Sequence, residues 1–97
     1  MITTIIKECE KHNYEFTYAI GNTLRFINKN VREELQLFEV LVDEDLERVA
    51  MAIIMDLGSW NEATEHDYND LEDIKNGIAS WISKENLAEA ENYFLED

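Results

Sequence analysis

The net negative charge of this chain comes entirely from its C-terminal part, and this limits how the chain can fold. Residues 1–38 contain as many basic as acidic side chains, whereas residues 39–97 carry the whole net charge of −14. Self-repulsion at such a charge destabilises a compact state. The fold must therefore bury its apolar residues while it keeps the acids of 39–97 at the surface. Phosphate groups would be repelled, so we expect no direct binding to nucleic acid or to an anionic membrane.

The composition predicts one folded domain that spans residues 1–97. Acidic segments that stay disordered are poor in apolar and aromatic residues, whereas this chain is 45% hydrophobic and 10% aromatic. Its longest apolar run, Val49–Met55, is too short to span a membrane. The single Cys9 cannot form an internal disulfide, and the chain does not start with a basic segment before a long apolar run. We therefore expect no signal peptide and a reducing, cytoplasmic location.

The N-terminal third predicts a helix followed by a β-hairpin. Apolar residues at helical spacing indicate a first helix over residues 2–12. From Tyr14 the apolar residues alternate instead, which is the period of a strand buried on one face. Gly21-Asn22 is a two-residue turn signal, so we expect residues 14–20 to pair with 23–28.

Residues 35–42 fit two interpretations. As a strand they would complete a small antiparallel sheet, and as a helix starting at Val31 they would present an apolar face. The β-branched Val40 and Val42, and the low stability of an isolated hairpin, favour the strand.

The remaining sequence is predicted to be helical. Asp43 is a plausible N-cap for a helix that ends before Gly58, and a capping box at Ser59 predicts a short helix to about residue 66. A further apolar stripe runs from Leu71 to Ile82, with Gly77 inside it as a sign of close packing or of a break, and Ser83 can cap a last helix. The expected fold class is α+β, with a small antiparallel sheet of two or three strands within 14–42, an N-terminal helix before it and several C-terminal helices after it.

No catalytic constellation is visible in the sequence. Cys9 and His12 are three residues apart but lack an orienting group, so we interpret Cys9 as core and His12 as surface. Glu62 and His66 are i,i+4 neighbours on the predicted short helix, which is too few ligands for a metal site. We expect a non-enzymatic protein with no cofactor and no metal. Trp60 and Trp81 are interpreted as core anchors.

The acids of residues 39–97 fit two readings. A run of acids is commonly a solvated face, but carboxylates three or four apart on a helix lie about 5–6 Å apart at Cβ, near the spacing of nucleic-acid phosphates. A folded, acid-coated surface can therefore occupy the nucleic-acid groove of a basic protein. The predicted partner-binding residues are Asp43, Asp45, Glu47, Glu62, Glu65, Asp67, Asp70, Glu72 and Asp73.

One family resemblance lies in the C-terminal part. The segment Asp73-Ile74-Lys75-Asn76-Gly77-Ile78-Ala79-Ser80-Trp81-Ile82, followed by Ala88-Glu89-Ala90-Glu91 and an acidic end, resembles small acidic phage inhibitors of type I-F CRISPR surveillance complexes. Size, acidity and the helix–sheet–helix order are also similar. The resemblance implies an anti-CRISPR DNA mimic that acts in the cytoplasm of an infected bacterium on the basic DNA-binding subunits of the complex.

The sequence thus predicts a non-enzymatic DNA-mimic inhibitor whose partner is a basic DNA-binding protein or ribonucleoprotein complex. Charge alone leaves two alternatives open. One is an antirestriction protein or another inhibitor of a DNA-binding protein. The other is a structural or regulatory phage protein that is acidic only for solubility.

Overall fold

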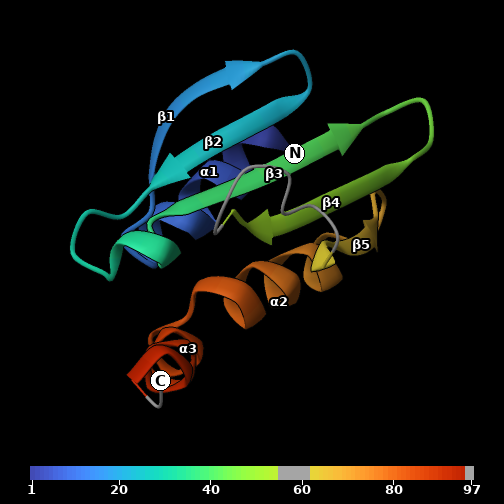
Figure 1. The fold of residues 1–97 in the computed structure, drawn as a ribbon. Helices are drawn as coiled ribbons and strands as arrows, with labels where there is room; N and C mark the ends of the chain where they lie inside the picture. The colour runs from blue at the N-terminus through green and yellow to red at the C-terminus, as the bar shows by residue number, and fades with distance from the viewer. Residues whose placement is uncertain (55–61, 96–97) are drawn as a thin grey trace.

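The computed structural model describes residues 1–54 and 62–95, which form an α+β fold with a five-stranded antiparallel sheet (Figure 1). The strands lie in the sheet in chain order. Helix α1 precedes the sheet, a 3₁₀ turn η1 precedes the third strand, and two helices follow the sheet. The bounds are α1 Ile2–Lys11, β1 Glu15–Ile20, β2 Thr23–Ile27, η1 Glu33–Leu35, β3 Leu37–Asp43, β4 Arg48–Ile53, β5 Thr64–Asp67, α2 Leu71–Ile82 and α3 Lys84–Leu95.

The first three strands follow from the alternating apolar pattern. β1 and β2 form the predicted hairpin, with Ile20 opposite Thr23 and Gly21 at φ +56°, a conformation that glycine adopts without a steric cost. Residues 35–42, for which strand and helix were both open, contribute β3. Buried Phe38, Val40 and Val42 alternate along β3 with less buried residues or with the paired Glu39. The strand interpretation of this segment is confirmed.

The predicted fold is wrong between residue 43 and the end of β5 at Asp67. The sheet has five strands rather than two or three, and two described helices follow it. The helix expected from Asp43 is replaced by a turn and β4, and residues 64–67, of which 64–66 were expected in the short helix, form β5. Residues 55–61, including Gly58, Ser59 and Trp60, lie outside the described residues.

The physical reason for this error is the position of β4 in the sheet. β4 lies between β3 and β5, and Met51, Ala52 and Ile53 are buried in succession. A strand buried on both faces loses its alternation and reads as a continuous apolar run, which periodicity cannot distinguish from a buried helix.

The core lies between the sheet and the helices. Ile5 and Cys9 of α1, and Ile74, Ile78 and Ile82 of α2, are fully buried in one cluster with the inward-facing residues of β2, β3 and β4. Figure 1 shows α1 behind the sheet and α2 running from the end of β5 towards α3. Among the described residues, no helix combines the length and the apolar character needed to cross a membrane.

Helix α2 occupies the predicted segment and is closely packed at Gly77. A Cβ atom added at Gly77 would lie 2.5 Å from two atoms of the His66 ring, so the glycine leaves room for this imidazole between α2 and β5. Of the two meanings the sequence allowed for Gly77, close packing is the one observed. The last helix α3 follows Ser83, whose Oγ accepts a hydrogen bond from the Asn86 N–H at 3.2 Å.

Candidate functional site

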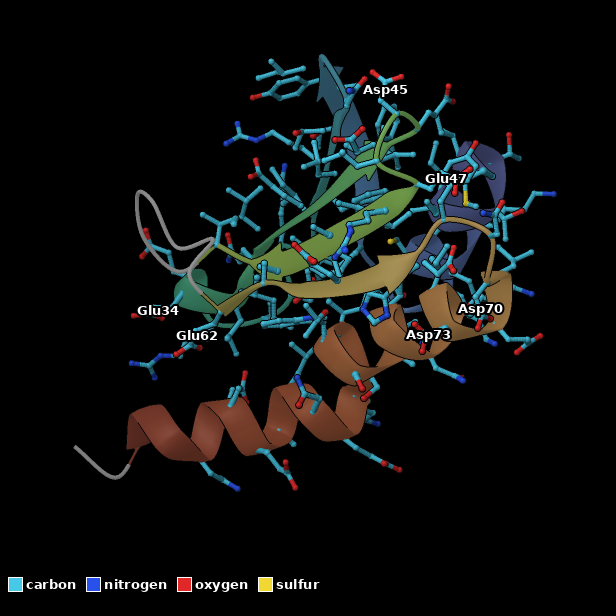
Figure 2. The ribbon with its side chains drawn as sticks, turned by 90° about the vertical axis from the view of Figure 1, so that its right-hand side faces the viewer. Glu34, Asp45, Glu47, Glu62, Asp70 and Asp73 are labelled. Atoms are coloured by element: carbon cyan, nitrogen blue, oxygen red, sulfur yellow. The ribbon has the colours of Figure 1, made fainter. Side chains whose placement is uncertain are left out.

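The sheet topology brings two acidic segments, separated in sequence, to one end of the molecule. Successive antiparallel strands run in opposite directions, so the β3–β4 turn and the C-terminal end of β5 lie at the same end of the sheet. The Tyr68 N–H donates to the Glu47 carbonyl oxygen at 3.0 Å and joins the two segments. Figure 2 shows Asp45, Glu47, Asp70 and Asp73 along this side. We call this surface the acidic end; its residues are Asp43, Glu44, Asp45, Glu47, Asp67, Asp70, Glu72 and Asp73.

The β3–β4 turn presents its carboxylates from a well-defined backbone. Asp43 ends β3, and its Oδ1 accepts a hydrogen bond from the Leu46 N–H at 3.0 Å. Glu47 closes the turn at φ +53°, in the left-handed region that non-glycine residues seldom adopt. The side chains of Asp45 and Glu47 are exposed. The turn therefore holds these acids at the surface in a defined arrangement.

The β5–α2 junction positions the second acidic segment. The Asp67 Oδ1 accepts from the Asn69 N–H at 2.8 Å, and the Asp70 Oδ1 accepts from the Asp73 N–H at 3.0 Å. Asp70 is thus the N-cap of α2, and Glu72 and Asp73 lie in its first turn, where negative charge interacts favourably with the helix dipole. The helix start explains locally why acids gather here.

Two of the predicted binding residues, Glu65 and Glu62, do not belong to the acidic end. The Glu65 carboxylate forms an ion pair with Arg48 across β4 and β5. Glu62 precedes β5 and lies on the opposite side of the view in Figure 2 from Asp45, Glu47, Asp70 and Asp73. Arg48 is the only lysine or arginine in segments 43–48 and 64–73, so the acidic end keeps a strong negative charge in spite of this pair.

Leu46 is a surface residue that the sequence analysis missed. On the helix expected from Asp43 it would belong to the apolar stripe that faces the core, but in the β3–β4 turn its side chain is 69% exposed. It lines a shallow hollow together with Glu47, Arg48, Glu65, His66 and Asp67. An apolar side chain surrounded by charges offers a contact that a bound partner can bury. Its place between acids in the sequence was the only available sign that it lies in a turn.

A row of hydrogen bonds runs beside the acidic end, from Asp73 to Trp81. The His66 Nδ1 lies 2.7 Å from the Asp73 Oδ2, and the His66 Nε2 lies 2.9 Å from the Thr64 Oγ1. The Trp81 Nε1–H donates to the same Thr64 oxygen at 2.8 Å. With a neutral imidazole, Nδ1–H donates to the carboxylate and Nε2 accepts from the hydroxyl. The expectation that Trp81 is a core anchor is corrected, because its side chain is half-buried and hydrogen-bonded.

Thr64, His66 and Asp73 follow one another in the order of a nucleophile, a base and an orienting carboxylate, but their contacts join a strand to a helix. Thr64 and His66 belong to the edge strand β5, whereas Asp73 and Trp81 belong to α2. The hydrogen bonds therefore fasten β5 to α2 across the space that Gly77 leaves for the imidazole. Since the indole N–H already occupies the Thr64 oxygen, we assign the row to packing between the strand and the helix.

The other cysteine and metal candidates give no reactive site among the described residues. Cys9 is fully buried, and burial together with the neighbouring carboxylates of Glu8 and Glu10 raises the pKa of its thiol. A thiol with a raised pKa is a poor nucleophile at neutral pH. No group of three or more His, Cys, Asp or Glu side chains in residues 1–54 and 62–95 has a geometry that could hold a metal ion.

A scan against protein-family models finds no match to this chain, and no curated protein or solved structure is detectably similar to it.

Proposed function

We propose that the protein is a non-enzymatic inhibitor that binds the nucleic-acid-binding surface of a basic protein through its acidic end. The observation that carries this proposal is the convergence of the two acidic segments at one end of the sheet, where Tyr68 is bonded to Glu47. Neither segment alone presents so much negative charge. A surface of this kind attracts a basic partner over long range and repels nucleic acid.

The acids of the acidic end do not have the phosphate-like helical spacing that the sequence analysis expected of a DNA mimic. Carboxylates at regular helical spacing were the expected substitute for phosphates, but Asp43–Glu47 and Asp67 lie on a turn and at the end of a strand. The proposal therefore rests on the local density of charge and on the exposed Leu46, and does not require a phosphate-like repeat. Charge accelerates the encounter, and a buried apolar contact slows dissociation.

The family resemblance makes a type I-F CRISPR surveillance complex the target to test first. We expect the protein to displace labelled target DNA from the purified complex in a gel-shift assay, and to leave naked DNA unshifted at the same concentration. The two ligands should compete, so that each raises the apparent Kd of the other. Simultaneous binding of DNA and protein without mutual weakening would contradict the proposal.

The acidic end is tested with two variants of equal net charge. The combined substitution Asp45→Asn, Glu47→Gln and Asp70→Asn removes three charges from the acidic end, and the asparagine that replaces Asp70 keeps an N-cap acceptor. The control combines Glu62→Gln, Glu85→Gln and Glu89→Gln, three exposed acids outside the acidic end. Only the first variant should lose competition with DNA, chiefly through slower association at low salt. Equal losses in both variants would show that total charge, rather than the acidic end, is responsible.

An inhibitor of a restriction enzyme or of another DNA-binding protein would use the same surface. If the CRISPR complex is unaffected, the protein should still capture a basic DNA-binding protein from bacterial lysate, and salt should release it. Capture by the control variant but not by the acidic-end variant would assign that partner to this surface.

A further inference from the structure

The two edges of the sheet differ in how well they are protected against further strand pairing. β5 has four residues, two of them charged, and packs against α2. β1 has six residues, carries one charge, at Glu15, and every residue in it is exposed. Short strands and charges are the usual means by which proteins keep a sheet edge from pairing. By these criteria β5 is protected and β1 is open.

The open edge carries large apolar side chains on both faces. Phe16, Tyr18 and Ile20 are 38%, 46% and 61% exposed. The pairing register places Phe16 opposite the buried Phe26, and Tyr18 and Ile20 opposite Arg25 and Thr23 on the other face. A bulge between Phe16 and Tyr18 interrupts the strand and leaves Tyr18–Ile20 as its regular part.

Tyr18 is held in place before any partner binds. The Arg25 guanidinium lies over its ring, with Cζ 5.5 Å from the ring centroid, and also donates to the Tyr18 hydroxyl oxygen. Arg25 is itself anchored by an ion pair with the buried Glu39. An aromatic side chain fixed in this way loses little conformational entropy when it is buried in an interface.

The distribution of charge indicates what pairs with β1. A second copy also carries a net charge of −14, so it can approach only through a region that is close to neutral. β1 belongs to residues 1–38, which sum to zero. The nearest part of the acidic end is the β3–β4 turn, where Glu44 and Asp45 line a shallow hollow together with Ala19 and Gly21. Glu44 and Asp45 of one copy repel the acids of the other copy, and salt screens this repulsion.

We propose that two copies of this chain associate through their β1 edges, in an antiparallel pairing of Tyr18–Ile20 that joins the two sheets into one. A symmetric dimer uses the same surface on both subunits. With the two-fold axis at Ala19, Tyr18 of one copy faces Ile20 of the other, an aromatic and β-branched pair of the kind that stabilises neighbouring strands. The antiparallel arrangement points the two acidic ends in opposite directions.

The backbone is suited to this register. Ile20 and Thr23 flank a two-residue turn, so we expect them to share the hydrogen-bonded positions of the hairpin. The alternation along an antiparallel strand then turns the N–H and C=O of Ala19 towards the free edge. Two copies paired at Ala19 would exchange both hydrogen bonds. One short strand pair buries little surface, so the dimer is weak and depends on concentration.

Sedimentation velocity across a wide range of concentration tests the dimer directly. The wild-type protein should shift from monomer to dimer as concentration rises, and the dimer should strengthen with added salt because the repulsion between copies is screened. Hydrogen exchange at residues 18–20 should slow in parallel. A protein that stays monomeric at all concentrations and salt levels would overturn the proposal, whether or not it inhibits a DNA-binding protein.

Two matched variants locate the interface. Ile20→Lys places a charge on the open edge and should weaken the dimer roughly tenfold or more. Leu46→Lys makes the same change of net charge at another exposed apolar residue, outside β1, and should leave the dimer as stable as in the wild type or slightly more so. Both sites are exposed, so circular dichroism should show folded protein in each case. Loss of the dimer in Leu46→Lys but not in Ile20→Lys would place the interface elsewhere and refute the β1 pairing.

Discussion

At the scale of single residues, His66 and Gly77 depend on each other. The His66 side chain is 12% exposed and is bonded on one side to Asp73 and on the other to Thr64. Its ring fills the space where a side chain at Gly77 would lie. Glycine destabilises a helix interior by about 1 kcal/mol relative to alanine. Here its lack of a side chain permits the contact between α2 and β5.

The substitution Gly77→Ala should therefore destabilise the protein by roughly 1–2 kcal/mol, because a clash with a ring held by two hydrogen bonds outweighs the gain in helix propensity. In a His66→Ala background the clash is absent, and the same change should stabilise by up to about 1 kcal/mol. Urea denaturation of the four proteins in this cycle measures both effects. Stabilisation by Gly77→Ala in the wild-type background would mean that the imidazole does not lie against the helix.

At the scale of secondary-structure elements, Asp70 both ends the β5–α2 connection and starts α2. Its carboxylate caps the helix through the Asp73 N–H, and it is also one of the acids of the acidic end. The two roles need different properties of the side chain. Capping needs an acceptor atom, whereas binding of a basic partner needs the negative charge.

Two substitutions at Asp70 separate these roles. Asp70→Ala should lower the free energy of unfolding by about 1 kcal/mol, because the cap is lost. Asp70→Asn keeps the acceptor and should change this free energy by less than about 0.5 kcal/mol. Thermal denaturation of both variants checks the difference. If asparagine is as harmful as alanine, the carboxylate stabilises the helix by its charge and not by the hydrogen bond.

At the scale of the whole molecule, the fold combines a net charge of −14 with a small apolar core. Grouping the acids at one end gives a strong local field, but it also adds repulsion that the apolar cluster must offset. This repulsion acts in the folded state and is largely relieved when the chain unfolds. Salt should therefore have opposite effects on folding and on binding to a basic partner.

Raising the ionic strength from about 0.01 M to about 0.15 M, which shortens the Debye length from about 30 Å to about 8 Å, should raise the midpoint of urea denaturation. The variant that combines Asp45→Asn, Glu47→Gln and Asp70→Asn should show a smaller rise, since it has less repulsion to screen. The comparison needs urea, because guanidinium is itself a salt. A midpoint that falls with salt would mean that ion pairs such as Arg48–Glu65 outweigh the repulsion.

Apolar spacing in the sequence was enough to locate the elements that bury a single face. Helices α1 and α2 each bury one stripe and β2 buries one face, so their predicted bounds lie near those observed. β1 was expected to bury one face but is exposed along its whole length, and the turn at Gly21-Asn22 is what places it beside β2. The apolar spacing of segment 35–42 fits both a strand and a helix, and its strand form depends on hydrogen bonds to β2 on one side and β4 on the other. The location of the acids in residues 39–97 was also available from the sequence alone.

The rest of the sheet and the composition of the acidic end depend on tertiary structure. β4 is buried on both faces at residues 51–53, and β5 is short and polar, so neither shows the full alternation that marks a strand. Because these two strands were expected as helices, the acids of 43–47 and 67–73 could not be placed side by side. Long-range strand pairing brings them together, moves Leu46 from an expected core to the surface and separates Glu62 from the other acids. Pairing of this kind joins residues far apart in sequence, and the local periodicity of a sequence does not indicate it.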